Sequence, residues 1–202
     1  MKKVILTVGL MLGIGLTTQM NAEVKGGIKL DANTSGFILS DMPGMESKLG
    51  FGLSVGGYTK IQFNDRFGFQ PEILVHYKNS KMEMGKIERD FQYFGVELPL
   101  YLSVKATENL FINVGPYVGV GLDARLKEGS GFGVHEFYKE YNNQDSEWHR
   151  WDFGAGLMLG WEFGNGLQVT AGYKIGFINP MREAGDATML NQTISLGLGY
   201  RF

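Results

Sequence analysis

Three groups of residues in this chain have side chains of the kinds that take part in catalysis. The run Asp145-Ser146-Glu147-Trp148-His149 contains a nucleophile, a base and acids, which are the groups used in acyl transfer. A catalytic triad is defined by convergence in space and not by adjacency in sequence, so we interpret the run as the polar end of a loop. Glu72 and Glu97 could form a carboxylate pair for acid–base catalysis.

Neither the glutamates nor the histidines support a reactive centre. Lysines share the predicted face of Glu72 and Glu97, which favours a structural ion-pair network. His76, His135 and His149 lie far apart in sequence, and there is no cysteine, phosphate-binding loop or zinc motif. We therefore assign no catalytic residue, metal ligand or cofactor.

The amino-acid composition argues against nucleic-acid binding and indicates a region of crowded packing. The 19 basic and 21 acidic residues nearly cancel, so no global field attracts a polyanion. The 30 glycines lie inside apolar segments and follow no collagen-like period. Their number indicates a place where only small side chains fit.

Alternation of apolar and polar residues recurs through the chain and predicts an all-β domain. In the last segment, Ile194, Leu196 and Leu198 alternate with serine and glycine. The pattern predicts eight strands at residues 24–33, 49–63, 67–78, 91–105, 110–122, 151–163, 167–177 and 193–202.

The predicted connections alternate in length. Three are tight turns, at residues 64–66, 106–109 and 164–166, and four are longer and polar, at residues 34–48, 79–90, 124–150 and 179–190. This pattern is typical of an eight-stranded antiparallel up-and-down transmembrane β-barrel with both termini in the periplasm.

The small polar face of each strand is predicted to line the lumen. An eight-stranded barrel has little interior space, so glycine, serine and a few long charged residues suit it better than bulky aliphatic residues. Phe111 and Tyr117 are exceptions on this face. The candidates for ion pairs across the lumen are Lys25, Lys29, Lys60, Glu72, Glu97, Lys105, Asp152, Glu162, Lys174 and Arg201.

The two ends of the chain carry further signals. Lys2 and Lys3 precede an apolar run of about 13 residues, too short to span a bilayer, so residues 1–22 are predicted to be a signal peptide cleaved after Ala22. Residues 23–202 then form the barrel. Aromatic residues near the strand ends suggest two girdles, with Trp148 and Trp151 anchored at the membrane surface.

Several stretches resemble the outer-membrane β-barrel family often labelled porin-like or PorT-like. They are Val24-Lys25-Gly26-Gly27-Ile28-Lys29-Leu30, Phe69-Gln70-Pro71-Glu72-Ile73-Leu74, Tyr93-Phe94-Gly95-Val96-Glu97-Leu98-Pro99-Leu100 and Gly115-Pro116-Tyr117-Val118-Gly119. The end of the chain, with Leu196, Leu198, Tyr200 and Phe202, looks like the C-terminal assembly signal of such barrels. The resemblance implies an outer-membrane location and handling by the barrel-assembly machinery.

Three hypotheses for function follow. The first is a non-enzymatic barrel with a role in membrane integrity, or in binding and adhesion through residues 124–150, the longest connection. The second is a narrow porin for small solutes, which needs a water path that eight strands normally lack. The third is an enzyme that modifies lipid A. The expected partners are outer-membrane lipid and an external ligand, and not nucleic acid.

Overall fold

The predicted alternation produces strands that join into one closed sheet. The computed structural model describes residues 23–84, 87–128, 134–138, 148–181 and 187–202. The strands are β1 (Glu23–Ser40), β2 (Met45–Gln62), β3 (Phe67–Met84), β4 (Ile87–Lys105), β5 (Leu110–Glu128), β6 (Val134–Glu136), β7 (Trp151–Glu162), β8 (Leu167–Gly176) and β9 (Thr188–Arg201).

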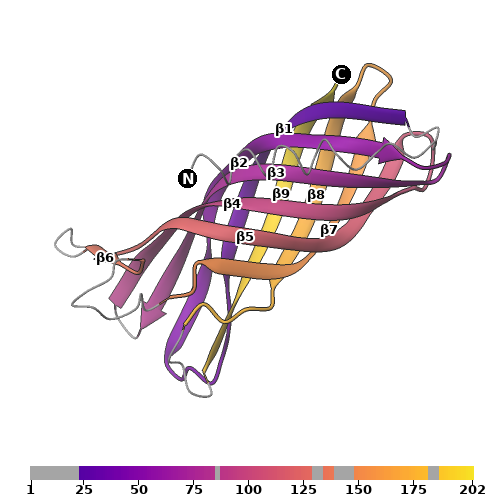
Figure 1. The fold of residues 1–202 in the computed structure, drawn as a ribbon. Helices are drawn as coiled ribbons and strands as arrows, with labels where there is room; N and C mark the ends of the chain where they lie inside the picture. The colour runs from indigo at the N-terminus through magenta and orange to yellow at the C-terminus, as the bar shows by residue number, and fades with distance from the viewer. Residues whose placement is uncertain (1–22, 85–86, 129–133, 139–147, 182–186) are drawn as a thin grey trace, which may run out of the picture.

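Eight of these strands form a ring (Figure 1). Each long strand pairs antiparallel with its neighbours, and β1 pairs with β9 to close the sheet. The short β6 pairs with the edge of β5 at Arg125–Lys127 and lies outside the ring. The prediction of an eight-stranded antiparallel up-and-down barrel is therefore confirmed. Among the described residues, no helix is long and apolar enough to cross a membrane.

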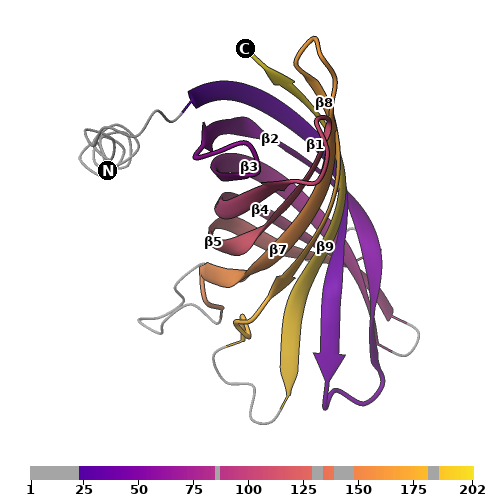
Figure 2. The same ribbon diagram turned by 90° about the vertical axis from the view of Figure 1, so that its right-hand side faces the viewer.

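The two ends of the barrel differ. One end of the barrel, which we call the terminal end, carries residues 23 and 202 and the turns at 63–66, 106–109 and 163–166. The opposite end, where β1 ends at Ser40 and β9 begins at Thr188, is the distal end (Figure 2). In the first of these turns, Asn64 Oδ1 accepts hydrogen bonds from the backbone N–H groups of Arg66 and Phe67, at 2.9 and 2.8 Å. Gly166 adopts a φ of 88°, which favours glycine.

The strands extend further toward the distal end than predicted. Residues 34–40 and 45–48, expected to be a connection, belong to β1 and β2. Most of residues 79–90 belongs to β3 and β4, β5 continues to Glu128, and β9 begins at Thr188. The prediction was wrong here because a strand beyond the apolar band can pair through its backbone without alternating hydropathy.

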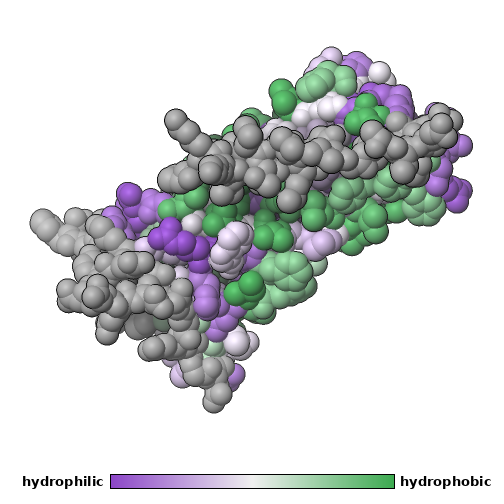
Figure 3. All heavy atoms as spheres, viewed as in Figure 1, coloured by the Kyte–Doolittle hydropathy of each residue, from purple (hydrophilic) through white to green (hydrophobic). Residues whose placement is uncertain are grey.

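The polar face points inward and the apolar face outward, as predicted. On β1, Lys29 and Asp31 are buried, whereas Ile28 and Leu30 are 60 and 53 % exposed. Figure 3 shows hydrophobic side chains along the middle of the visible wall. Exposed aromatic residues lie near the strand ends, at Phe63, Phe67, Trp151, Phe153, Trp161, Phe163, Phe177, Tyr200 and Phe202.

Glycines inside the barrel make room for aromatic rings. A Cβ atom at Gly160 would lie 2.1 Å from the ring of Phe111, and one at Gly154 would lie 2.6 Å from the ring of Tyr117. Both rings are buried in the lumen. The two aromatic exceptions on the small face are therefore accommodated by glycines on the neighbouring strand β7.

Candidate functional site: the filled lumen and its distal cap

A central lysine joins two carboxylates in the middle of the lumen. Lys29 Nζ lies 3.2 Å from Glu72 Oε2 and 3.4 Å from Asp31 Oδ2, and it also lies 3.5 Å from Met158 Sδ. Gln70 donates a hydrogen bond of 2.8 Å to the other oxygen of Glu72. The three charged side chains are at most 7 % exposed, so each relies on the others in place of water.

A second cluster reverses this arrangement, with one carboxylate between two lysines. Glu97 Oε2 lies 3.4 Å from Lys78 Nζ, and Glu97 Oε1 pairs with Lys174. The charges of Glu72 and Asp31 also act on Lys174, so the two clusters are coupled. Together they contain three lysines and three carboxylates, and their formal charges cancel.

A third cluster lies toward the terminal end. Glu162 accepts from Lys60 Nζ at 3.0 Å and from Arg201 Nε at 2.7 Å, and Gln168 donates to it at 2.7 Å. Glu162, Lys60 and Arg201 border a cavity of ≈ 50 Å³, which Lys25 and Lys105 also line. Lys25 lies at the rim and pairs at 2.6 Å with the exposed Glu23.

Asp152 is held by hydrogen bonds from two neutral side chains. Tyr117 donates to Asp152 Oδ2 at 3.1 Å, and Asn191 donates to the same oxygen at 3.0 Å. The structure thus places nine of the predicted lumen residues in ion pairs or hydrogen bonds, while Lys105 forms no ion pair with another described residue.

Side chains fill the space between the polar clusters. Tyr101, Phe111 and Met158 form a buried group, each at most 4 % exposed. Lys60 Nζ lies 4.5 Å from the centre of the Phe111 ring, a cation–π contact. This layer lies across the lumen beside the charged clusters.

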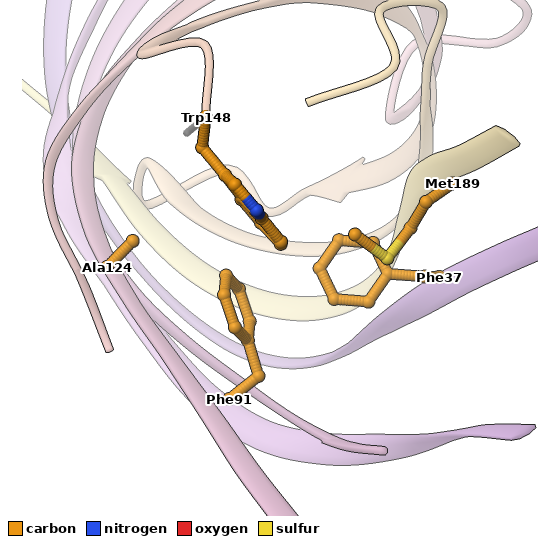
Figure 4. Packing of buried hydrophobic residues seen from close by; sticks show 5 residues of the cluster. All are labelled: Phe37, Phe91, Ala124, Trp148 and Met189. Carbon is orange, nitrogen blue, oxygen red and sulfur yellow. The ribbon is translucent and has the colours of Figure 1, made fainter. Parts of the chain in front are cut away.

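An aromatic cap covers the lumen near the distal end. Figure 4 shows Phe37, Phe91 and Trp148 converging inside the ring of strands, with Ala124 and Met189 beside them. The ring of Trp148 stacks on Phe91 at 4.9 Å and lies 4.3 Å from Phe137. Trp148 is only 7 % exposed, so its predicted anchoring at the membrane surface was wrong, because aromatic partners inside the barrel bury it.

A pocket of ≈ 40 Å³ opens beside this cap. Its aromatic lining includes Tyr93, Tyr138 and Trp148, and its polar lining includes Lys78, Ser80, Asp152 and Asn191. Ser80 Oγ is buried and has no hydrogen-bond partner within the described residues. Arg150 lies over the Tyr138 ring at 4.9 Å and donates to its carbonyl oxygen at 2.8 Å. Burial raises the pKa of Tyr138 to about 12.

The residues considered for catalysis that the structure describes do not assemble into a reactive centre. His76 is buried and stacks on Tyr93 at 5.3 Å, and His149 lies at the distal pocket. Residues 145–147 lie outside the described residues, as do residues 1–22. Within the described part of the chain, no group of three His, Asp or Glu residues could hold a metal ion.

Comparison with known proteins identifies the family. The family model described as outer membrane protein beta-barrel domain matches residues 6–181. The chain belongs to this family. Membership agrees with the closed ring, the polar lumen and the apolar outer face, and it places the protein among integral outer-membrane barrels. No curated protein sequence matches the chain.

Solved structures share the fold of this outer-membrane barrel. The attachment invasion locus protein of Yersinia pestis, in complex with the heparin analogue sucrose octasulfate, is 17 % identical, with a TM-score of 0.50. Neisserial surface protein A is 12 % identical, with a TM-score of 0.51. In both comparisons 89 % of this chain and 99 % of the other chain are covered.

Sequence reasoning missed several members of the site. Asp31 and Lys78 lie on the predicted polar face but were not among the ion-pair candidates, although strand alternation alone places them in the lumen. Phe37 and Phe137, which pack in the distal cap, had no detectable signal because they lie in segments that were expected to be connections.

Proposed function

We propose that this outer-membrane barrel neither conducts solutes nor catalyses a reaction, and that it binds an external ligand at its distal end. The observation that carries the proposal is the filled lumen beneath an aromatic-lined distal pocket. Residues between the two end cavities, including Glu97, Tyr101 and Asn113, are at most 3 % exposed. A water path would have to displace them.

The chemistry of the distal pocket supports binding. Aromatic rings line it together with a lysine, a carboxylate, an amide and a hydroxyl that has no partner among the described residues. Pockets of this kind commonly bind small organic ligands, because the apolar walls supply contact and the few polar groups fix orientation. The pocket fits part of a ligand that presents a ring face and hydrogen-bonding groups, such as a glycan.

Biogenesis forms part of the proposal. We expect residues 1–22 to direct export and to be removed after Ala22, and the terminal end to face the periplasm. The assembly signal would be read on the outer face, where Leu196, Leu198, Tyr200 and Phe202 are at least 50 % exposed. Phe202 also donates its N–H to Gly26 O at 3.0 Å, at the seam where the barrel closes.

Conductance across planar bilayers tests the first half of the proposal. The purified, refolded protein should insert without current steps, and a heat-modifiable band on a gel would show that it is folded. Stable current steps from folded protein would refute the proposal and favour the narrow porin.

A glycan array tests the second half. Protein in nanodiscs should bind a subset of glycans, and Tyr138→Ala or Arg150→Ala should remove that binding. Arg125→Ala is the matched control, because Arg125 lies at the same end and pairs with the exposed Asp123 without lining the pocket. Equal loss in the control, or no binding at all, would count against the pocket.

Analysis of lipid A tests the remaining alternative. Lipid A from cells with the protein, without it, and with Ser146→Ala or His149→Ala should have the same acylation. A change that depends on Ser146 or His149 would establish an enzyme and overturn this part of the proposal.

A further inference from the structure

Three prolines interrupt the wall of the barrel on adjacent strands. Proline has no N–H to donate and is normally excluded from the middle of a sheet. The pairing of β2 with β3 passes from Tyr58↔Glu72 to Ile61↔Phe69 with no pair between them, at Pro71. Similar gaps occur between β3 and β4 at Pro99 and between β4 and β5 at Pro116. This part of the wall therefore has fewer ladder hydrogen bonds than the rest.

Small residues face outward beside the first gap. Most glycines of the wall point into the lumen, but Gly57 of β2 pairs with the exposed Ile28 of β1, and Gly26 lies on the same outward face of β1 as Ile28. Gly26 is opposite Thr59, and Thr59 faces Pro71 across the first gap. A row of small side chains therefore crosses three strands where the surrounding outer face carries bulky residues.

This row forms the floor of a groove. Its volume is ≈ 300 Å³, compared with ≈ 40 and ≈ 50 Å³ for the two cavities at the ends of the lumen. Ile73 and Leu98 line one side, and Phe202 lines the other. The Phe202 ring occupies its place because residue 26 has no side chain, since a Cβ atom at Gly26 would lie 2.9 Å from that ring.

The position of the groove determines what can fill it. The groove lies on the outer face of a membrane barrel, among exposed Ile28, Ile73 and Leu198. Hydrocarbon is the solvent on that face, and water is excluded from it. We infer that the groove is a binding site for one acyl chain of a membrane lipid, which lies across Gly57 and Thr59 and contacts Phe202.

The groove should hold this chain more firmly than the rest of the surface does. A chain on the convex wall touches protein on one side only, whereas a chain in the groove also touches its two flanks. Dispersion attraction grows with the number of close atom contacts, so the enclosed chain is retained longer. The wild-type barrel should therefore keep one lipid when it leaves the bilayer.

Native mass spectrometry can count that lipid. The full chain is folded into vesicles of phosphatidylethanolamine and phosphatidylglycerol, transferred to a mild detergent and weighed. We expect one retained phospholipid per barrel. Gly57→Leu should lower the retained fraction about tenfold, because the new side chain fills the groove. A Cβ atom at Gly57 meets only Gly27 O, at 3.4 Å, so the wall can accept this substitution.

Two further variants keep the inference falsifiable. Thr59→Leu fills the groove from a second position and should have the same effect if Gly57→Leu does not fold. Ala171→Leu adds similar bulk to the outer face of β8, away from the groove, and should leave lipid retention unchanged. Heat modifiability shows which variants are folded.

Several outcomes would overturn the inference. They are a wild-type barrel that retains no lipid, a folded groove variant that retains as much as the wild type, and an equal loss in Ala171→Leu. A mass of two chains would assign the groove to contact between copies instead.

Discussion

The triplet of Lys29, Asp31 and Glu72 predicts unequal effects from two substitutions of similar size. Lys29→Met removes the cation that both carboxylates contact, at 3.4 and 3.2 Å, and leaves two buried negative charges together. Glu72→Gln leaves the Lys29–Asp31 pair in place, and the one oxygen of the new amide can still accept from either Lys29 or Gln70. The lysine substitution should therefore be much more damaging.

The magnitude follows from burial and distance. Two unit charges about 4 Å apart interact by roughly 4 kcal/mol at an effective dielectric constant of about 20. Breaking a buried ion pair by removing one partner typically costs about 3–5 kcal/mol. We expect Lys29→Met to lower the free energy of unfolding by about that amount, and Glu72→Gln by roughly 1 kcal/mol, the value of one hydrogen bond.

Urea unfolding of the barrel in lipid vesicles measures this difference, with heat modifiability and tryptophan fluorescence as two independent readouts. Glu23→Gln is the control, because its pair with Lys25 is exposed at the rim and its loss should leave the unfolding midpoint unchanged. Equal losses for Lys29→Met and Glu72→Gln would refute the reasoning that the shared cation holds the triplet together.

Three further predictions use the same unfolding assay. Gly160→Ala places a methyl group against the Phe111 ring and should lower the free energy of unfolding by about 1–3 kcal/mol. Adding Phe111→Leu to this variant should recover most of the lost stability, and failure to recover it would exclude the steric cause. Leu196→Arg introduces a charge into the lipid-facing wall and should cost about 2–4 kcal/mol, so an unchanged stability would contradict the assigned orientation of the faces. Trp148→Ala should cost about 3–5 kcal/mol by emptying the distal cap, yet it should leave conductance at zero, because the layer containing Phe111 stays in place.

The closed ring could be predicted from the sequence because a membrane barrel repeats one simple rule along every strand. Leu196 and Leu198 must face lipid, and Gly197 between them must face a narrow lumen. That alternation also places Lys29, Glu72 and Glu97 inside. Which carboxylate meets which lysine could not be predicted, because the pairing depends on the register between strands and on side-chain reach.

The distal end could not be predicted for a different reason. Beyond the apolar band, the outer face of a strand no longer contacts hydrocarbon and the inner face carries apolar residues of the distal cap such as Phe37, so hydropathy no longer reports which residues are paired. Ser40 pairs with Thr188 there, although both residues lie in segments that read as connections. The burial of Trp148 depends on rings from three distant segments, Phe37, Phe91 and Phe137, and no local pattern in the sequence encodes their convergence.

Closure of the ring has a kinetic consequence. The seam joins Gly27 to Arg201, so the first strand finds its second partner only after the last strand has been made. Contacts between such distant parts of a chain carry a large loop-closure entropy and slow folding. Until they form, β1 and β9 each expose a row of unpaired backbone groups, the feature from which sheets aggregate. The chain therefore most needs protection from aggregation in the interval between its synthesis and the closure of the ring.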